Sequence, residues 1–265
     1  MKVSDAVAFA GHQVHVCRWR EAGTLLRWLG PDLRGLRVLD VAGGDGYWAG
    51  QARRRGARAV AIDIAAGKLR RGRELASAPA LVLGDALRLP FPDASFDRVM
   101  SICAIEHFDD GPRALSEMAR VLAPGGELVM SADTLSRAAE WPHLYQAHCE
   151  RYHVQRTYTH QQLTGLLAER GLDVAEYVYQ FRSRWSERLY LTLSAHGGRA
   201  GFNAAAPLAP LVAAADRGTR ADRGAIVLVR ARRRPAGSTA DRRAGTSAGR
   251  PAGARGQAAA EAAAT

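Results

Sequence analysis

The stretch VLDVAGGDG, residues 38–46, decides the fold class. Its apolar run, 38–41, ends in closely spaced glycines, and a pattern typical of a helix follows from residue 47. At such a strand–turn–helix junction the first N–H groups of the helix face the turn, and glycines leave the backbone open to a ligand. The stretch therefore predicts a ligand-binding turn at the carboxyl end of the first strand of an α/β sheet.

Short runs rich in β-branched residues continue on the carboxyl side of this turn and alternate with helical patterns. This alternation predicts βαβ units and therefore an α/β fold, a Rossmann-like, doubly wound, mostly parallel sheet of seven strands. Residues 124–126, Pro-Gly-Gly, are expected to form the turn that starts the fifth strand. We expect strands at 37–41, 59–63, 80–83, 96–102, 127–131, 174–180 and 225–230.

Helical patterns separate these strands, and one further helix is expected at 17–29, before the first strand. Two segments, 133–158 and 183–223, are too long for ordinary connections, which predicts helical cap insertions. The expected organisation is an N-terminal helical segment at 1–36, a single domain at 37–230 and a disordered tail at 231–265, rich in Ala, Gly and Arg. The remaining expected helices are 47–55, 66–76, 111–122 and 159–170.

The charge and cysteine content exclude several classes of function. The net charge is +11, but the tail contributes seven arginines against two acidic residues, and no basic stripe interleaved with aromatics runs through the body. We therefore expect no nucleic-acid partner. Three cysteines without CxxC spacing argue against a disulfide framework and favour a cytoplasmic protein. The first residues lack the pattern of a signal peptide, and no run of about 18 apolar residues predicts a membrane span.

The glycine turn alone leaves the class of ligand open. Residues 44–49, GDGYWA, also satisfy the GxGxxA pattern of dinucleotide-binding enzymes. Asp63, about 20 residues further on at the expected end of the second strand, suits the ribose of NAD(P) equally well. At this point an NAD(P)-dependent oxidoreductase, or a turn that binds nothing, remains an alternative.

Further stretches follow this turn in a fixed order: GDA at 84–86, LRLPFPDASFDRV at 87–99, SICAIEHFDD at 101–110 and RVLAPGGELVMSA at 120–132. The series from 37 to 132 resembles the class I S-adenosylmethionine-dependent methyltransferases of type 11. The resemblance implies S-adenosyl-L-methionine as cofactor and a small-molecule acceptor, such as a natural product, sugar, quinone or lipid-like compound. It also implies that the last strand runs antiparallel.

The resemblance assigns roles by position. Asp40 would hold the turn, and Asp63 with Ile64 would meet the ribose. Asp85 would accept from the adenine amino group while the Ala86 N–H meets a ring nitrogen. The amino-acid end of the cofactor would lie against Ala42, Gly43, Gly44, Gly46, Ser101, Ile102 and Cys103.

Ala42 stands where the family usually has a glycine. Its methyl group is expected to be tolerated if the local backbone keeps a negative φ.

Three residues are candidates for acceptor chemistry. His107 follows the fourth strand and is either the general base or a residue that shapes the pocket. If 144–153 is helical, His148 and Tyr152 share one face, and Cys149 and His153 share the next. The first pair can line an acceptor pocket, while packing of a cap helix is a compatible alternative. Cys149 and His153 provide only two ligands, so no metal site is expected.

The segment 183–223 combines an apolar run, 204–215, with flanking arginines. A hydrophobic lid is the preferred interpretation, with peripheral membrane contact or a homodimer surface as alternatives. The predicted function is methyl transfer to an O, N or C nucleophile of a small, partly apolar metabolite. The alternatives are an NAD(P)-dependent oxidoreductase and a non-catalytic, methyltransferase-like partner subunit; the intact Gly44, Gly46, Asp63 and Asp85 argue against the latter.

Overall fold

The computed structural model describes residues 9, 12, 16–219 and 222–235. One seven-stranded sheet has the order β3-β2-β1-β4-β5-β7-β6. Strands β1 to β5 pair in parallel, while β7 is antiparallel to both β5 and β6. The predicted fold class is therefore confirmed, including the antiparallel last strand. The strands are β1 Arg37–Val41, β2 Arg58–Asp63, β3 Ala80–Leu83, β4 Phe96–Ser101, β5 Leu122–Asp133, β6 Leu172–Gln180 and β7 Ile226–Arg233.

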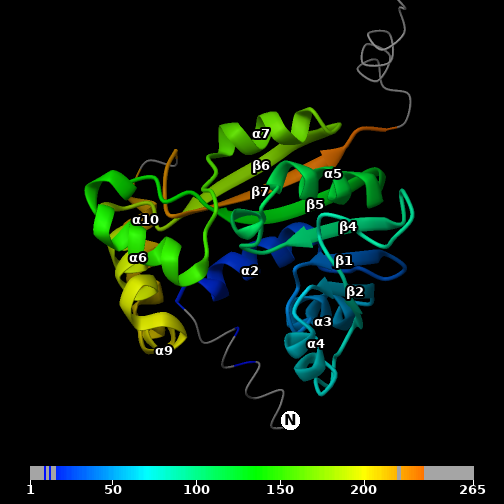
Figure 1. The fold of residues 1–265 in the computed structure, drawn as a ribbon, viewed down its shortest axis with the longest axis horizontal. Coiled ribbons are helices and arrows are strands. Elements are labelled where there is room, and N and C mark those ends of the chain that lie inside the picture. Colours follow the sequence, from blue (N-terminus) through cyan, green and yellow to red (C-terminus); the bar gives the residue numbers. More distant parts are fainter. Residues whose placement is uncertain (1–8, 10–11, 13–15, 220–221, 236–265) are drawn as a thin grey trace, which may run out of the picture. The chain divides into compact units, whose positions relative to one another are not determined.

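Helices cover both faces of the sheet (Figure 1). Helix α5 (Gly111–Val121) and helix α7 (His160–Ala168) lie on one face, and α2 (Arg18–Leu29) and α3 (Tyr47–Arg54) lie on the other. Helix α4 (Ala66–Gly72) packs beside β2 and β3.

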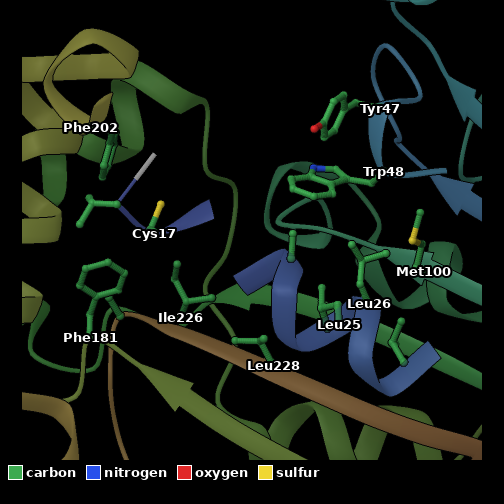
Figure 2. Packing of buried hydrophobic residues seen from close by; sticks show 14 of the residues in the cluster. Cys17, Leu25, Leu26, Tyr47, Trp48, Met100, Phe181, Phe202, Ile226 and Leu228 are labelled. Atoms are coloured by element: carbon green, nitrogen blue, oxygen red, sulfur yellow. The ribbon is translucent and has the colours of Figure 1, made fainter. Parts of the chain in front are cut away.

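Apolar spacing explains why these helices pack as they do. In α5 the buried residues Ala114, Leu115 and Met118 recur at intervals of three and four, so they form one stripe toward the sheet. The Asp110 side chain accepts from the Arg113 N–H at 2.9 Å and caps this helix. On the opposite face, Figure 2 shows Leu25 and Leu26 of α2 in a cluster of buried apolar residues that also contains Trp48 and Met100.

The largest differences from the expected strand ends are at the start of β5 and the end of β7. Strand β5 already pairs at Leu122, opposite Phe96, and pairs again at Glu127, opposite Arg98. The Pro-Gly-Gly sequence therefore forms an irregularity inside β5 rather than the turn before it. Strand β7 continues to Arg233, so the first three residues of the expected tail belong to the sheet. The remaining tail, 236–265, lies outside the described residues.

Both long connections are helical insertions. The first contains η2 (Ala138–Glu140) and α6 (Pro142–Tyr152); the second contains α8 (Arg184–Thr192), η3 (Leu193–Gly197), α9 (Gly198–Ala204), η4 (Ala206–Leu208) and α10 (Ala209–Arg217). We call them the first and second cap. In Figure 1 the labelled cap helices α6, α9 and α10 gather beside one end of the sheet.

A buried carboxylate, Asp216, fastens the second cap to the body. It accepts from the backbone N–H groups of Phe181 and Arg182, at 3.0 and 2.8 Å, and pairs with Arg20 of α2. Among the described residues, no helix has the length and apolarity needed to cross a membrane.

Candidate active site

The glycine turn is held by the side chain of Asp63. One carboxylate oxygen accepts from the Gly44 N–H and the other from the Ala65 N–H, both at 2.8 Å. Asp63 ends β2 and is only 4% exposed. Since each carboxylate oxygen can accept two hydrogen bonds, these two bonds leave Asp63 able to accept a further bond from a ligand hydroxyl.

Asp40 lies directly beneath the same turn. A Cβ at Gly43 would come within 2.7 Å of the Asp40 carboxyl, so only glycine fits there. Burial raises the pKa of Asp40 from 3.8 to about 8, although a backbone N–H bond opposes the shift. The residue therefore supports the turn as a neutral carboxyl group at pH 7.

Ala42 has a φ of +58°, in the left-handed region. The condition under which the Ala42 methyl group was expected to be tolerated, a negative φ, is therefore not met. An L-residue in this conformation is destabilised by roughly 1–2 kcal/mol, because its Cβ crowds the following carbonyl oxygen. The turn therefore carries backbone strain at the position where the family usually has glycine.

Two large apolar side chains are exposed at neighbouring strand ends. Ile64, just after β2, is 74% exposed, and Leu83, the last residue of β3, is 61% exposed. Asp85 follows, also exposed, and its Oδ1 accepts from the Leu87 N–H, while Ala86 is buried. Apolar faces beside a carboxylate suit a flat ring with an amino group. Leu83 was not among the predicted residues, although its place before Gly84-Asp85 could have indicated it.

The end of β4 completes this edge. Ser101 donates its hydroxyl to the Val41 carbonyl at 3.2 Å, and the Cys103 N–H donates to Ser131 at 2.9 Å. Ile102, between them, is partly exposed. These bonds join the ends of β1, β4 and β5. They hold the predicted residues 101–103 next to the end of β1, where the glycine turn begins.

A residue far upstream also reaches the turn. His12 Nε2 lies 3.0 and 3.1 Å from the two Asp45 carboxylate oxygens, and its ring stacks on Tyr47 with a centroid distance of 4.7 Å. Sequence reasoning did not predict this contact, because no local pattern links positions 12 and 45.

A group of three buried carboxyl residues, Glu21, Glu106 and Asp133, lies beside the end of β4; we call it the acidic cluster. Glu21, from α2, accepts from the Cys103 thiol at 2.8 Å, from the Ser131 hydroxyl, and from Arg18 at 3.0 Å. Cys103, one of the predicted cofactor-binding residues, thus contacts the acidic cluster through Glu21.

Asp133 ends β5 and joins both caps. It accepts from the Tyr190 hydroxyl of α8 at 3.0 Å and lies 2.8 Å from Nε2 of His148, in α6. The His148 and Tyr152 rings lie 5.2 Å apart, so these two residues share a helix face as predicted. His148 is buried, whereas Tyr152 is partly exposed. Asp133 and Tyr190 were not predicted as site residues.

Glu106 differs from the other members of the acidic cluster. It is fully buried, and neither of its carboxyl oxygens has a hydrogen-bond partner among the described residues. Burial, reinforced by nearby Asp133, raises its pKa well above the usual range. Its neighbour His107 is partly buried, which lowers the imidazole pKa, and its Nδ1 also has no partner in the described part of the chain. A neutral imidazole with an open nitrogen can accept a proton.

No metal site was expected at Cys149 and His153, which offer only two ligands. His153 directly follows α6 and has a left-handed backbone conformation, with φ +55°. A different group, Cys103, Glu106 and Asp133, has its ligand atoms within 4.8 Å of one another. Its donor set fits a metal ion poorly. The Cys103 thiol has a pKa raised by burial and donates to Glu21, and both oxygens of Asp133 are already in use.

Two surface hollows lie elsewhere. One, of about 420 Å³, is lined by residues at the starts of strands, among them Arg37, Arg58 and Phe96. The other, of about 470 Å³, lies between α2 and β6. Because ligands of open α/β sheets bind outside the carboxyl ends of the strands, the first hollow, at the starts of the strands, does not fit the ligand site of this fold.

Comparison with known proteins agrees with this geometry. A family model described as a methyltransferase domain matches residues 39–130. A malonyl-[acyl-carrier protein] O-methyltransferase of Serratia marcescens is 37% identical over 112 residues, 42% of this chain and 44% of that protein. The enzyme of the same name from Yersinia pestis is 32% identical over 206 residues, covering 72% of this chain and 74% of the relative. The chain thus spans less than half of the first relative but about three quarters of the second.

A similar solved structure is geranyl diphosphate C-methyltransferase from Streptomyces coelicolor A3(2), in complex with Mg²⁺, geranyl diphosphate and S-adenosyl-L-homocysteine. Its TM-score is 0.60 at 18% identity, over 82% of this chain and 77% of that chain, which supports the fold. Taken with the family model and the Yersinia relative, the chain belongs to the S-adenosylmethionine-dependent methyltransferases of type 11.

Proposed function

We propose that this protein transfers the methyl group of S-adenosylmethionine to a nucleophile of a small, partly apolar molecule. The observation that carries the proposal is the alignment of the Asp63-held turn, the exposed Ile64 and Leu83, and Asp85 along the ends of β1, β2 and β3. Such an edge offers N–H groups, a carboxylate for hydroxyls and apolar faces for a base, in the order that a nucleoside with an amino-acid arm requires.

The cofactor would supply a methyl group on a positively charged sulfur, which is already an activated leaving group. The protein must then orient the acceptor in line and exclude water. Asp63 and Asp85 would position the nucleoside, while the two caps, joined through Asp133, would close the acceptor side. His107, neutral at pH 7 and open at Nδ1, is suited to receive a proton from the acceptor.

The relatives leave the acceptor open, because by name two act on a malonyl-carrier conjugate and a structural neighbour acts on geranyl diphosphate. We favour a lid role for the second cap, because buried Asp216 fastens it to α2 and β6. Trp185 of this cap is 49% exposed, so it is a weaker candidate for the acceptor pocket than buried Tyr190. Membrane contact and dimerisation remain hypotheses for its exposed surface, and a cytoplasmic location remains an expectation.

Calorimetric titration with S-adenosylhomocysteine, S-adenosylmethionine and NADPH tests the proposal. We expect the first two to bind and NADPH not to bind, since β7 interrupts the all-parallel order of dinucleotide folds. Asp85→Asn should weaken S-adenosylhomocysteine binding, while Glu169→Gln, with its exposed side chain, should leave it unchanged. Binding of NADPH alone would overturn the proposal. Cofactor binding without transfer to any nucleophile would favour the non-catalytic alternative.

A further inference from the structure

The acidic cluster contacts Cys103, one of the residues expected to hold the cofactor. The Cys103 sulfur and the carboxyl oxygens of Glu106 and Asp133 lie within 4.8 Å of one another. Cys103 also belongs to the end of β4, beside the glycine turn. If the cofactor binds as proposed above, the cluster faces its reactive end, so this inference rests on the proposed function.

The three carboxyl groups of the cluster differ in their partners. Glu21 is paired with Arg18, and Asp133 is paired with His148 and Tyr190. Glu106 is fully buried, and no hydrogen bond from a described residue reaches either oxygen. Burying a carboxyl group without hydrogen bonds is costly, so Glu106 requires a partner that the other described residues do not supply.

A ligand for this position must bring hydrogen-bond donors, since Glu106 offers acceptors. A positive charge is favoured as well, because burial and the nearby Asp133 oppose ionisation of the Glu106 carboxyl, and a cation beside it would offset both. A divalent cation meets the charge requirement, but the Cys103 thiol is a donor to Glu21, and each Asp133 oxygen already has one hydrogen-bond partner. An aliphatic ammonium group meets both requirements, with up to three N–H donors and one charge.

We propose that the acidic cluster binds the amino group of the methyl acceptor, and that the acceptor is therefore a small primary or secondary amine. Glu106 receives the direct hydrogen bond from the nitrogen. Asp133 holds the two caps around it and adds negative potential.

The transfer balances as follows. The bound ammonium R–NH3+ gives one proton to the Glu106 carboxylate or to His107 Nδ1, which frees the nitrogen lone pair. The nitrogen then attacks the methyl carbon, so an N–C bond forms, the C–S bond breaks, and its electron pair stays on sulfur as S-adenosylhomocysteine. The product leaves as R–NH2CH3+, and the proton held by Glu106 or His107 passes to water. Burial raises the pKa of Glu106, which favours its holding the transferred proton, and lowers the pKa of His107, which keeps that imidazole neutral and able to accept one.

Matched fragment pairs test this inference on the full chain saturated with S-adenosylhomocysteine. The pairs are n-butylamine and n-butanol, benzylamine and benzyl alcohol, and cyclohexylamine and cyclohexanol, with binding followed by saturation-transfer NMR. We expect at least one amine to bind ten times more tightly than its alcohol. The preference should fall at least tenfold in Glu106→Gln, whose affinity for S-adenosylhomocysteine should stay within threefold of wild type. Glu169→Gln is the matched surface control and should retain the preference.

Absence of any amine preference in the wild-type protein would overturn the inference, as would a preference that Glu106→Gln retains. Stoichiometric binding of Mg²⁺, Mn²⁺ or Zn²⁺ that is lost in Glu106→Gln would also overturn it, in favour of a cation site. The wild-type comparison needs no variant, so it remains decisive even if Glu106→Gln does not fold. Failure to bind S-adenosylhomocysteine would reject the proposed function, whereas binding of it without amine preference would reject only this inference.

Discussion

The cofactor half of the site, at the ends of β1, β2 and β3, differs in construction from the acceptor half, formed by the acidic cluster and the caps. In the cofactor half, backbone groups and close glycine packing dominate, and Asp63 reaches the turn across 19 residues. In the acceptor half, buried side chains meet from α2, β5, α6 and α8; Glu21 and Ser131 are 110 residues apart. A site of the first kind tolerates few substitutions at its turn, while one of the second kind can change its ligand through single side chains.

The largest effect is expected from Asp133→Ala, a variant that should damage the acceptor half and leave the cofactor half intact. It removes the common acceptor of Tyr190 and His148 and leaves both polar groups buried without it. The unfolding free energy should fall by about 3 kcal/mol, because each unsatisfied buried group costs roughly 1–3 kcal/mol. Methyl transfer should be lost, while the affinity for S-adenosylhomocysteine changes less than threefold. Denaturant unfolding and calorimetry measure the two quantities; an equal loss of cofactor affinity would contradict the division into halves.

Asp63→Ala tests the cofactor half. The variant loses the bonds to Gly44 and Ala65 and the proposed bond to ribose. Hydrogen bonds to charged groups contribute roughly 1.5–3 kcal/mol, so the dissociation constant for S-adenosylhomocysteine should rise at least tenfold. The caps should remain docked, which hydrogen exchange across α6 and α8 can follow. Unchanged affinity would show that the turn does not bind the cofactor.

The pH dependence of stability sharpens the account of the turn. Asp40 has a folded-state pKa of about 8, above its ordinary 3.8, so the unfolded chain ionises first as pH rises. Its contribution is fully present below about pH 4 and is lost as pH rises through about 8, with a slope of at most about 1.4 kcal/mol per pH unit. Asp40→Asn should remove this part of the slope. Denaturant melts of both proteins at pH 5, 6, 7 and 8 measure it, and parallel curves would contradict the assignment.

The smallest effect is expected from Ala42→Gly. Glycine accepts the φ of +58° without steric cost, though it loses more entropy on folding. A net gain of about 0.5–1 kcal/mol in unfolding free energy is expected. Ala123→Gly, in β5 at a position whose φ is not positive, is the control and should not stabilise the protein. A loss of stability in Ala42→Gly would mean that the strain at the turn is absent in solution.

The differences between expectation and structure follow the same division. The succession of strands and helices along the chain, the glycine turn and the acidic residues at the ends of β2 and β3 were predictable, because each depends on local periodicity and turn chemistry. The sign of φ at Ala42 was not predictable. The turn is held by the hydrogen bond from the Gly44 N–H to Asp63, which lies in another strand. The start of β5 was misplaced because pairing with β4 overrides the usual role of Pro-Gly-Gly.

By itself, the sequence determined the seven-stranded fold, the position of the glycine turn and the two cap segments, all of which arise from patterns spanning a few residues to one βαβ unit. Only the tertiary structure decided that Glu21 of α2 meets Cys103, that Asp133 joins both caps, and that the buried Glu106 carboxyl receives no hydrogen bond from any other described residue. These facts depend on which side chains converge from distant segments and lose their water together. Burial and pairing are properties of that convergence, and no local pattern encodes them.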